Sequence, residues 1–409
     1  MCGAALIAPT LATIYWAGID ESGGEFAPGV LPGAFGVDYA FVNNSAIDIY
    51  VEKSKVFLTL YNSISGNRIK DLTRDLHLSK VNLFRVAFLL ERMCPLEYGL
   101  GSKFNETYFM HYKEAIDHIT LTKGAYAILD PHNYMRYNDA SEQPLSGSII
   151  GNWSDPKAAT TQQFGEFWGE LASRFRHNEK VIFGLMNEPW GTNTSLVLKN
   201  DQSAIDHIRA AGCEQLILAP GNDWTGGHSW HDNGEDSNAN WMWKLRDPIH
   251  NTAFDIHEYL DVDFSGSHVD CVSDPRIFLS NLTSWLEDHN FKAMITEFGG
   301  SNTTGCYDML KVLIDYMEES SVYIGWSMWA AGPLWGSQSA CCENYGSLGS
   351  LEPDSLAIDG SPGLYEQIWL AHMKPMVPKE LVWSGVSSVR GGKKTLPPQK
   401  KSPGEESIV

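Results

Sequence analysis

The sequence lacks an excess of basic residues, a long hydrophobic run and the paired cysteines of a zinc site. Its 409 residues include 30 Lys and Arg against 50 Asp and Glu, so the formal net charge is −20. An acidic surface repels phosphate groups, so we expect neither nucleic acid nor an anionic membrane as a partner. No apolar stretch approaches the roughly 20 residues that a membrane-spanning helix needs. These absences leave a globular protein that can act on a neutral molecule.

Two sequence motifs that would indicate a metal site or a nucleotide site are absent. None of the seven cysteines shows CxxC spacing, and no GxGxxG follows the first expected strand, which disfavours a dinucleotide-binding fold. The sequence has more Asn-x-Ser/Thr sequons than the roughly three or four that its composition predicts. The excess gives mild support for a secreted protein. The six sequons begin at Asn43, Asn105, Asn152, Asn193, Asn281 and Asn302.

Eight short apolar runs alternate with segments of helical periodicity. The runs span residues 13–17, 81–88, 125–130, 181–187, 215–220, 253–257, 292–297 and 322–329. The helical segments span 105–121, 161–176, 203–211, 274–288 and 309–319. Alternating strands and helices predict a parallel sheet, and eight such units in about 370 residues predict a single (β/α)8 TIM barrel. A doubly wound open sheet is the alternative.

Two of the runs end in a glutamate that is followed by a chain-breaking residue. Glu188 lies in Asn187-Glu188-Pro189, and Glu297 lies in Thr296-Glu297-Phe298-Gly299. A parallel barrel brings the carboxyl ends of its strands to one rim, so we expect the two carboxylates to face each other. Retaining glycoside hydrolysis uses such a pair about 5–5.5 Å apart. We therefore assign Glu188 as the acid/base, with a pKa raised by its neighbour, and Glu297 as the nucleophile.

Polar residues of catalytic type end several of the other runs. Arg85 lies in the second half of the second run and is expected to keep Glu297 ionised, while Tyr259 follows the sixth and could donate a hydrogen bond to the same carboxylate. His132 and His257 also lie at strand ends. The paired His spacings typical of catalytic metal sites are absent, so we expect no metal or other cofactor. A metal-dependent barrel hydrolase remains an alternative.

Together these motifs resemble glycoside hydrolase family 5, and most closely its fungal endoglucanases, from about residue 15 to about residue 389. The motifs are Asn82-Leu83-Phe84-Arg85, Asp130-Pro131-His132-Asn133-Tyr134, Met186-Asn187-Glu188-Pro189, Pro220-Gly221-Asn222-Asp223-Trp224, His257-Glu258-Tyr259 and Thr296-Glu297-Phe298-Gly299-Gly300. The resemblance implies a monomeric, secreted, retaining endo-β-1,4-glucanase that acts on a β-glucan polysaccharide. β-Mannanase or β-1,3-glucanase activity, and a sugar-binding barrel without turnover, are the alternatives.

The resemblance also implies roles that spacing alone does not give. Asn187 would hydrogen-bond the 2-hydroxyl of the reacting sugar, and His132 and His257 would line the reacting subsite. Trp329 would form a sugar platform, and Cys271 and Cys306 would form a disulfide. Several tryptophans follow strand ends, among them Trp224, and one or two of these are expected to stack on outer sugars.

Three segments depart from this family pattern or lie outside the expected barrel, which we place at residues 13–389. Residues 1–12 are apolar without a basic region, and they form either a degraded signal peptide or the lead into the first strand. Ser54-Lys55-Val56 recurs as Ser79-Lys80-Val81, so the intervening 57–80 is interpreted as an insertion, either translated intron or a surface loop. Residues 390–409 are polar and expected to be disordered.

Overall fold

The computed structural model describes residues 14–51, 80–137, 147–334, 350–353, 355, 362–378 and 381. The expected leader at 1–12, the insertion at 57–80 apart from its last residue, and the tail at 390–409 lie outside the described residues. Within the described ranges, no helix is both long enough and apolar enough to cross a bilayer.

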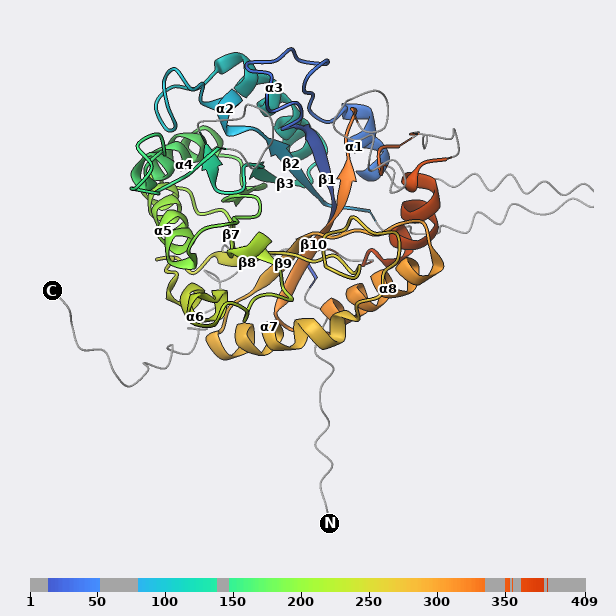
Figure 1. Cartoon of the computed structure of the whole chain (residues 1–409). Coiled ribbons are helices and arrows are strands. Elements are labelled where there is room, and N and C mark those ends of the chain that lie inside the picture. Colours follow the sequence, from blue (N-terminus) through green and yellow to red (C-terminus); the bar gives the residue numbers. More distant parts are fainter. Residues whose placement is uncertain are drawn as a thin grey trace, which may run out of the picture.

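Eight parallel strands close into a barrel in the order β1-β10-β9-β8-β7-β6-β3-β2 (Figure 1). A closed ring of strands excludes the doubly wound open sheet, so the predicted (β/α)8 fold is confirmed. The barrel strands are β1 (Trp16–Gly24), β2 (Leu83–Phe88), β3 (Tyr126–Pro131), β6 (Val181–Gly184), β7 (Ile217–Pro220), β8 (Thr252–His257), β9 (Ala293–Glu297) and β10 (Tyr323–Ala331).

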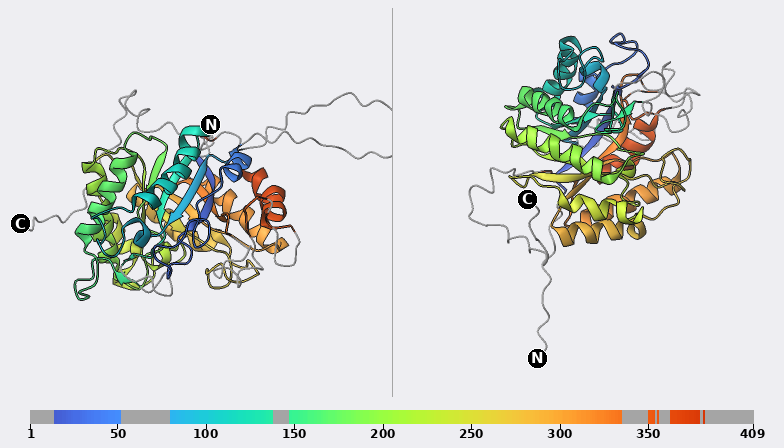
Figure 2. Two further views of the ribbon diagram at one scale, coloured as in Figure 1. Left: turned by 90° about the horizontal axis from the view of Figure 1, so that it is seen from above. Right: turned by 60° about the vertical axis from the view of Figure 1, so that its left-hand side comes forward.

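The main helices lie outside the strand ring, as the views in Figures 1 and 2 show. Polar caps mark where they begin: Thr160 and Gln163 form a reciprocal capping box, and Asp274 caps a helix whose first residue is proline. Two short antiparallel strands, β4 (Arg136–Tyr137) and β5 (Ser148–Ile149), follow β3. The helices are α1 (Asn44–Val51), α2 (Leu90–Met93), α3 (Glu106–Asp117), α4 (Thr161–Phe175), α5 (Thr194–Ala210), α6 (Asn238–Trp241), α7 (Pro275–His289) and α8 (Thr304–Glu319), with a π-helical segment at Tyr365–Met373.

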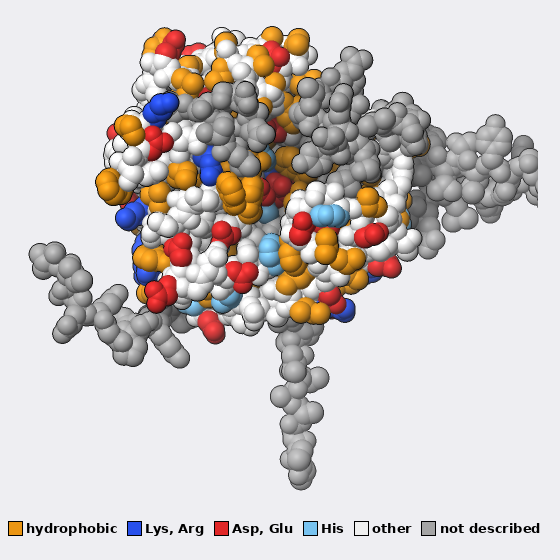
Figure 3. Space-filling model, in the orientation of Figure 1, with side chains coloured by type: hydrophobic (Ala, Val, Ile, Leu, Met, Phe, Trp, Pro, Cys, Tyr) orange, Lys and Arg blue, Asp and Glu red, His pale blue; other side chains and the backbone are white. Residues whose placement is uncertain are grey.

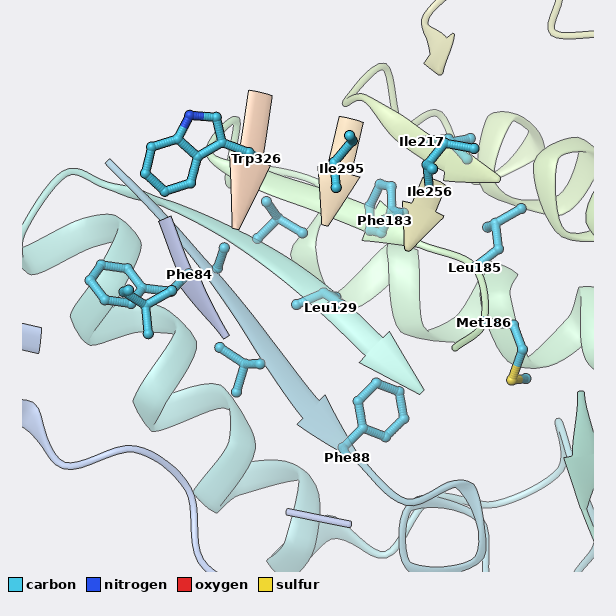
Figure 4. Close-up of a cluster of buried hydrophobic side chains, with 14 of the residues drawn as sticks. Phe84, Phe88, Leu129, Phe183, Leu185, Met186, Ile217, Ile256, Ile295 and Trp326 are labelled. Carbon is cyan, nitrogen blue, oxygen red and sulfur yellow. The ribbon is translucent and has the colours of Figure 1, made fainter. Parts of the chain in front are cut away.

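The alternation of side chains along each strand builds two separate cores. Outward-facing residues such as Phe84 and Phe88 pack in the large cluster that includes the helix residues (Figure 4). Inward-facing Leu83, Ile128 and Met294 belong to a smaller cluster at the amino ends of the strands. Two residues further along β2, the inward position is occupied by Arg85. The barrel interior therefore changes from apolar to charged toward the carboxyl ends of its strands.

The first strand and helix α5 extend furthest beyond the predicted bounds. The first strand was expected at 13–17 but runs to Gly24, and its second half reads Asp20-Glu21-Ser22-Gly23. A polar, glycine-containing sequence does not resemble a buried strand, yet every residue of β1 is buried between β2 and β10. Helix α5 begins at Thr194 and not at residue 203. Its first two turns carry little apolar periodicity, so the sequence pattern did not indicate them.

Candidate active site

Arg85 lies at the centre of the charged end of the barrel and is 1% exposed. Its Nη1 donates to Glu297 Oε2 at 3.0 Å, and its Nη2 donates to Asn187 Oδ1 at 2.6 Å. Nη2 also lies 3.2 Å from Asp130 Oδ2. One guanidinium on β2 thus joins side chains from β3, the end of β6 and β9. The planar group fixes their relative positions because its donors point in set directions.

Glu297 ends β9 and receives a hydrogen bond on each carboxylate oxygen. Arg85 donates to Oε2, and the Tyr259 hydroxyl donates to Oε1 at 2.9 Å. Burial raises the pKa of Glu297, while the Arg85 charge, His132 and the Tyr259 hydrogen bond act in the opposite direction. Both donors predicted from the sequence to support this carboxylate are in contact with it.

Glu188 follows β6 and faces Glu297. A carboxylate oxygen of Glu188, one of Glu297 and an imidazole nitrogen of His257 all lie within 4.8 Å of one another. Such closeness suits the short carboxylate spacing of retaining enzymes and not the 6.5–9.5 Å of inverting ones. The backbone of Glu188 has φ of 41°, in the left-handed region that non-glycine residues rarely adopt. Such backbone strain is typical of functional sites.

The environments of the two glutamates separate their proton affinities. Burial and the neighbouring charge of Glu297 raise the pKa of Glu188 well above its usual range. Unlike Glu297, Glu188 receives no direct hydrogen bond from a cationic side chain among the described residues; its Oε1 is 2.8 Å from Nδ1 of His257. Burial and the nearby charge of Arg85 hold the pKa of His257 well below its usual range, so this imidazole is neutral at pH 7. Glu297 therefore ionises first and Glu188 retains its proton.

His132 and Trp329 lie against each other at the rim. Their rings stack with centroids 5.2 Å apart, and His132 Nδ1 is 2.9 Å from Asp130 Oδ2. Burial opposes the charged imidazole, but the Asp130 carboxylate raises the pKa of His132 above its usual value. Trp329, near the end of β10, is half-buried, with the rest of its surface open to solvent. The structure thus places both residues beside the carboxylate pair.

Trp224 belongs to an aromatic group formed by three loops. Its ring is 5.2 Å from Trp190 and 5.7 Å from Tyr134. The backbone N–H of Trp224 donates to the carbonyl oxygen of Pro189 at 3.1 Å, which ties this loop to the residue after Glu188. Figure 3 shows acidic and histidine side chains gathered in a hollow near the middle of this face. The aromatic group is a surface on which a neighbouring sugar could stack.

Sequence reasoning missed two acidic residues beneath the pair. Asp20 on β1 lies 3.6 Å from Arg85 Nη1, and Asp255 on β8 accepts a hydrogen bond from Thr296. Burial raises the pKa of Asp20 well above its usual value and that of Asp255 to about 7. Asp20 was not predicted because it lies in the half of β1 that the apolar pattern does not indicate. Asp255 lies in a strand that was predicted, and only its inward register could have indicated it.

Glu188, His257 and Glu297 are close enough to hold a metal ion by distance alone. Both oxygens of Glu297 already accept hydrogen bonds, one of them from the Arg85 cation. A divalent ion would have to displace or lie beside that guanidinium, so this donor set fits a metal poorly.

The predicted disulfide is present. Cys271 and Cys306 are bonded with their Cα atoms 4.7 Å apart, and they tie the loop between β8 and α7 to the first turn of α8. The same loop holds Gly266 against the Tyr259 ring, where an added Cβ would come 2.5 Å from a ring carbon. The bridge therefore closes a loop that packs on one of the two donors to Glu297. Cys94 and Cys213 are buried free thiols.

A closed α/β barrel whose rim carries two facing glutamates is the arrangement that a retaining glycoside hydrolase needs. Comparison with known proteins agrees: the cellulase (glycosyl hydrolase family 5) profile matches residues 49–332. The chain is 58% identical over 400 residues to Endoglucanase 1 of Robillarda sp. (strain Y-20), covering 96% of this chain and 97% of that protein. It is 36% identical over 336 residues to endo-beta-1,4-glucanase A of Emericella nidulans, covering 81% and 88%.

Solved structures with the same fold are also similar. An endo-beta-1,4-glucanase from Xanthomonas axonopodis pv. citri superposes with a TM-score of 0.71 at 29% identity, covering 89% of this chain and 98% of that one. The structure of XacCel5A with cellopentaose gives a TM-score of 0.67 at 30% identity, covering 86% and 96%. The chain belongs to glycosyl hydrolase family 5.

Proposed function

We propose that this hydrolase is an endo-β-1,4-glucanase that cleaves internal bonds of cellulose and related β-glucans with retention of anomeric configuration. The observation that carries the proposal is the approach of Glu188 and Glu297 to within 4.8 Å. It is supported by two curated relatives that are named as endoglucanases and align over most of their length.

In the first step Glu297 attacks the anomeric carbon, and Glu188 donates its proton to the departing glycosidic oxygen. The bond to the leaving sugar breaks as an ester bond to Glu297 forms. Glu188, now ionised, next accepts a proton from water, and the resulting hydroxide releases the sugar and restores Glu297. The raised pKa of Glu188 fits it to give a proton in the first step and take one in the second.

Three neighbours position the reacting sugar and the nucleophile. Asn187 uses its Oδ1 to accept from Arg85, and its buried Nδ2 has no partner among the described residues. We expect this Nδ2 to donate to the sugar 2-hydroxyl beside Glu297. Arg85 and Tyr259 stabilise the nucleophile as an anion, and His132 with Trp329 forms the wall on which the sugar ring rests.

A panel of defined polysaccharides tests the substrate. We expect reducing ends to be released from carboxymethylcellulose and mixed β-glucan, with the β-anomer formed first in an NMR time course. Faster cleavage of mannan or of β-1,3-glucan would replace the substrate assignment, and initial release of the α-anomer would contradict retention. Binding of cello-oligosaccharides without any release would identify a non-catalytic barrel. Activity that survives chelation would exclude the metal-dependent alternative.

We also propose that the protein is secreted and acts as a monomer. The excess of sequons and the Cys271–Cys306 bridge support secretion, since disulfides persist in oxidising compartments. Expression with its native start, followed by recovery from culture medium and light scattering, tests both statements.

A further inference from the structure

A cavity of about 710 Å³ lies between the loop that follows β1 and the loop that follows β2. None of the residues assigned to the reaction lines it. Both loops leave the carboxyl ends of their strands, so the cavity lies at the same rim as the two glutamates. Its lining includes Leu31, Glu91, Leu96, Glu97, Tyr98 and Lys103.

Arg92 holds the wall that comes from the β1 loop. Its side chain is fully buried, and its guanidinium donates at 2.8–3.2 Å to backbone carbonyl oxygens of Gly24, Ala27 and Pro32. The same group lies 4.7 Å from the centre of the Tyr39 ring. These contacts fix a segment that forms no helix or strand. The wall is therefore already in place before any ligand binds.

The opposite wall is tied in a similar way. The Ser102 hydroxyl donates to the carbonyl oxygen of Gly99 at 2.8 Å, and the Asn105 N–H donates to that of Met93 at 2.8 Å. Asn105 also caps α3 by accepting from the N–H of Tyr108. The loop that carries Tyr98 is thus anchored at both ends.

A hydrogen bond connects the wall of this cavity to the residue that follows His132. The Glu91 carboxylate on its inner wall accepts from Nδ2 of Asn133 at 2.8 Å. Asn133 directly follows His132, which stacks on Trp329. The cavity and the reacting centre thus share one rim and are linked through the adjacent residues His132 and Asn133.

The chemistry of the lining favours a neutral polyhydroxyl ligand. Glu97 supplies an exposed carboxylate acceptor, whereas the carboxylates of Glu91 and Glu106 already accept from Asn133 and Arg174. Arg92 is satisfied by carbonyl oxygens, and the Lys103 ammonium lies 4.5 Å over the Tyr98 ring. An anionic ligand would meet more negative than positive charge. Tyr98 is 48% exposed and shares the cavity with Leu31 and Leu96, so it offers an apolar surface of the kind on which sugar rings stack.

We infer that this cavity is a distal glucan-binding site, which holds a segment of the polysaccharide outside the cleft that cleaves it. The inference rests on the proposed function for the identity of the ligand. It predicts that Tyr98 and Glu97 affect the capture of long chains and leave the chemical step unchanged.

The test compares a long and a short substrate. We expect Tyr98→Ala and Glu97→Gln to raise KM on soluble mixed β-glucan by roughly three- to tenfold and leave kcat/KM on an aryl cellobioside within about twofold. Leu121→Ala is the matched control, because Leu121 is 66% exposed and lies between α3 and β3, at the amino ends of the strands. The enzymes are produced without glycans, since the Asn105 sequon lines the cavity. Unchanged KM on the polymer, or equal losses on both substrates, would overturn the inference.

A binding measurement separates this inference from the proposed function. Calorimetry of cellohexaose with Glu297→Gln should show two sites, and adding Tyr98→Ala should remove the weaker one. A single site in both proteins would refute the distal site even if the wild type cleaves β-glucan. Failure of the wild type to cleave any β-glucan would refute the proposed function, whatever the isotherm shows.

Discussion

Removal of the Tyr259 hydroxyl should shift the acid limb of the pH–rate profile to higher pH. In the structure this hydroxyl donates to Oε1 of Glu297 at 2.9 Å and stabilises the carboxylate over the carboxylic acid. A hydrogen bond to a charged group contributes about 1.5–3 kcal/mol. Divided by about 1.4 kcal/mol per pKa unit, Tyr259→Phe should raise the pKa of Glu297 by roughly one to two units.

The direction in which the acid limb moves follows from the protonation state of Glu297 that reacts. Glu297 must be ionised to attack, so raising its pKa depletes the reactive form at acid pH and leaves the plateau less affected. On the acid side of the profile, the rate should fall by roughly ten- to a hundredfold for a shift of one to two units. The upper part of this range is expected, because the Glu297 side chain is only 8% exposed and water can replace the lost donor poorly.

The assay is kcat/KM for an aryl cellobioside measured from acid to neutral pH. Tyr307→Phe serves as the control, since Tyr307 stacks on His372 at 3.7 Å, on the α8 side of the barrel and outside the site. Thermal unfolding of both variants checks that the fold is intact. An acid limb that stays in place in Tyr259→Phe, or that moves equally in the control, would refute the assigned contact.

Three further predictions concern the proton donor, a buried acid and the disulfide. Glu188→Gln should slow cleavage of poor leaving groups far more than good ones, and equal losses on both would contradict its role as the acid. Burial raises the pKa of Asp255 from 3.8 to about 7, so the folded state keeps this proton to a higher pH than the unfolded chain does. The stability that protonated Asp255 contributes is therefore full below about pH 4 and is lost as the pH rises through 7. In urea unfolding, the free energy of unfolding of Asp255→Asn should therefore exceed that of the wild type by roughly 2–4 kcal/mol at about pH 8 and by little at about pH 4. A difference that does not depend on pH would count against the pKa shift. Replacing both Cys271 and Cys306 by Ala should lower the free energy of unfolding by about 3–4 kcal/mol, because the bridge closes a loop with a sequence separation of 35, and an unchanged urea midpoint would contradict this.

The sequence predicted those parts of the fold that follow from local pattern. The runs at 81–88 and 253–257 became β2 and β8, because a strand buried on both faces must be apolar along most of its length. The polar residues in the second half of these runs indicated Arg85 and His257, since closing the barrel brings every carboxyl end to one rim. The pairing of Glu188 with Glu297 was predicted from this meeting of the carboxyl ends alone.

What the sequence could not predict depends on contacts between distant segments. Asp20 lies on a polar stretch that forms a strand only because β2 and β10 flank it. The wall of the distal cavity is fixed by Arg92, whose partners are carbonyl oxygens about 60 residues earlier in the chain. A backbone carbonyl has no signature in the sequence, so neither the loop conformation nor the cavity could be read from it.

Covalent trapping of the nucleophile tests the central claim most directly. A 2-deoxy-2-fluoro cellobioside with a good leaving group should form a stable ester when the nucleophile attacks, because the fluorine slows the second step. Peptide mass spectrometry should then find the added sugar on Glu297, and none on the Glu297→Gln variant. Labelling of Glu188, or inactivation without any labelled peptide, would contradict the account.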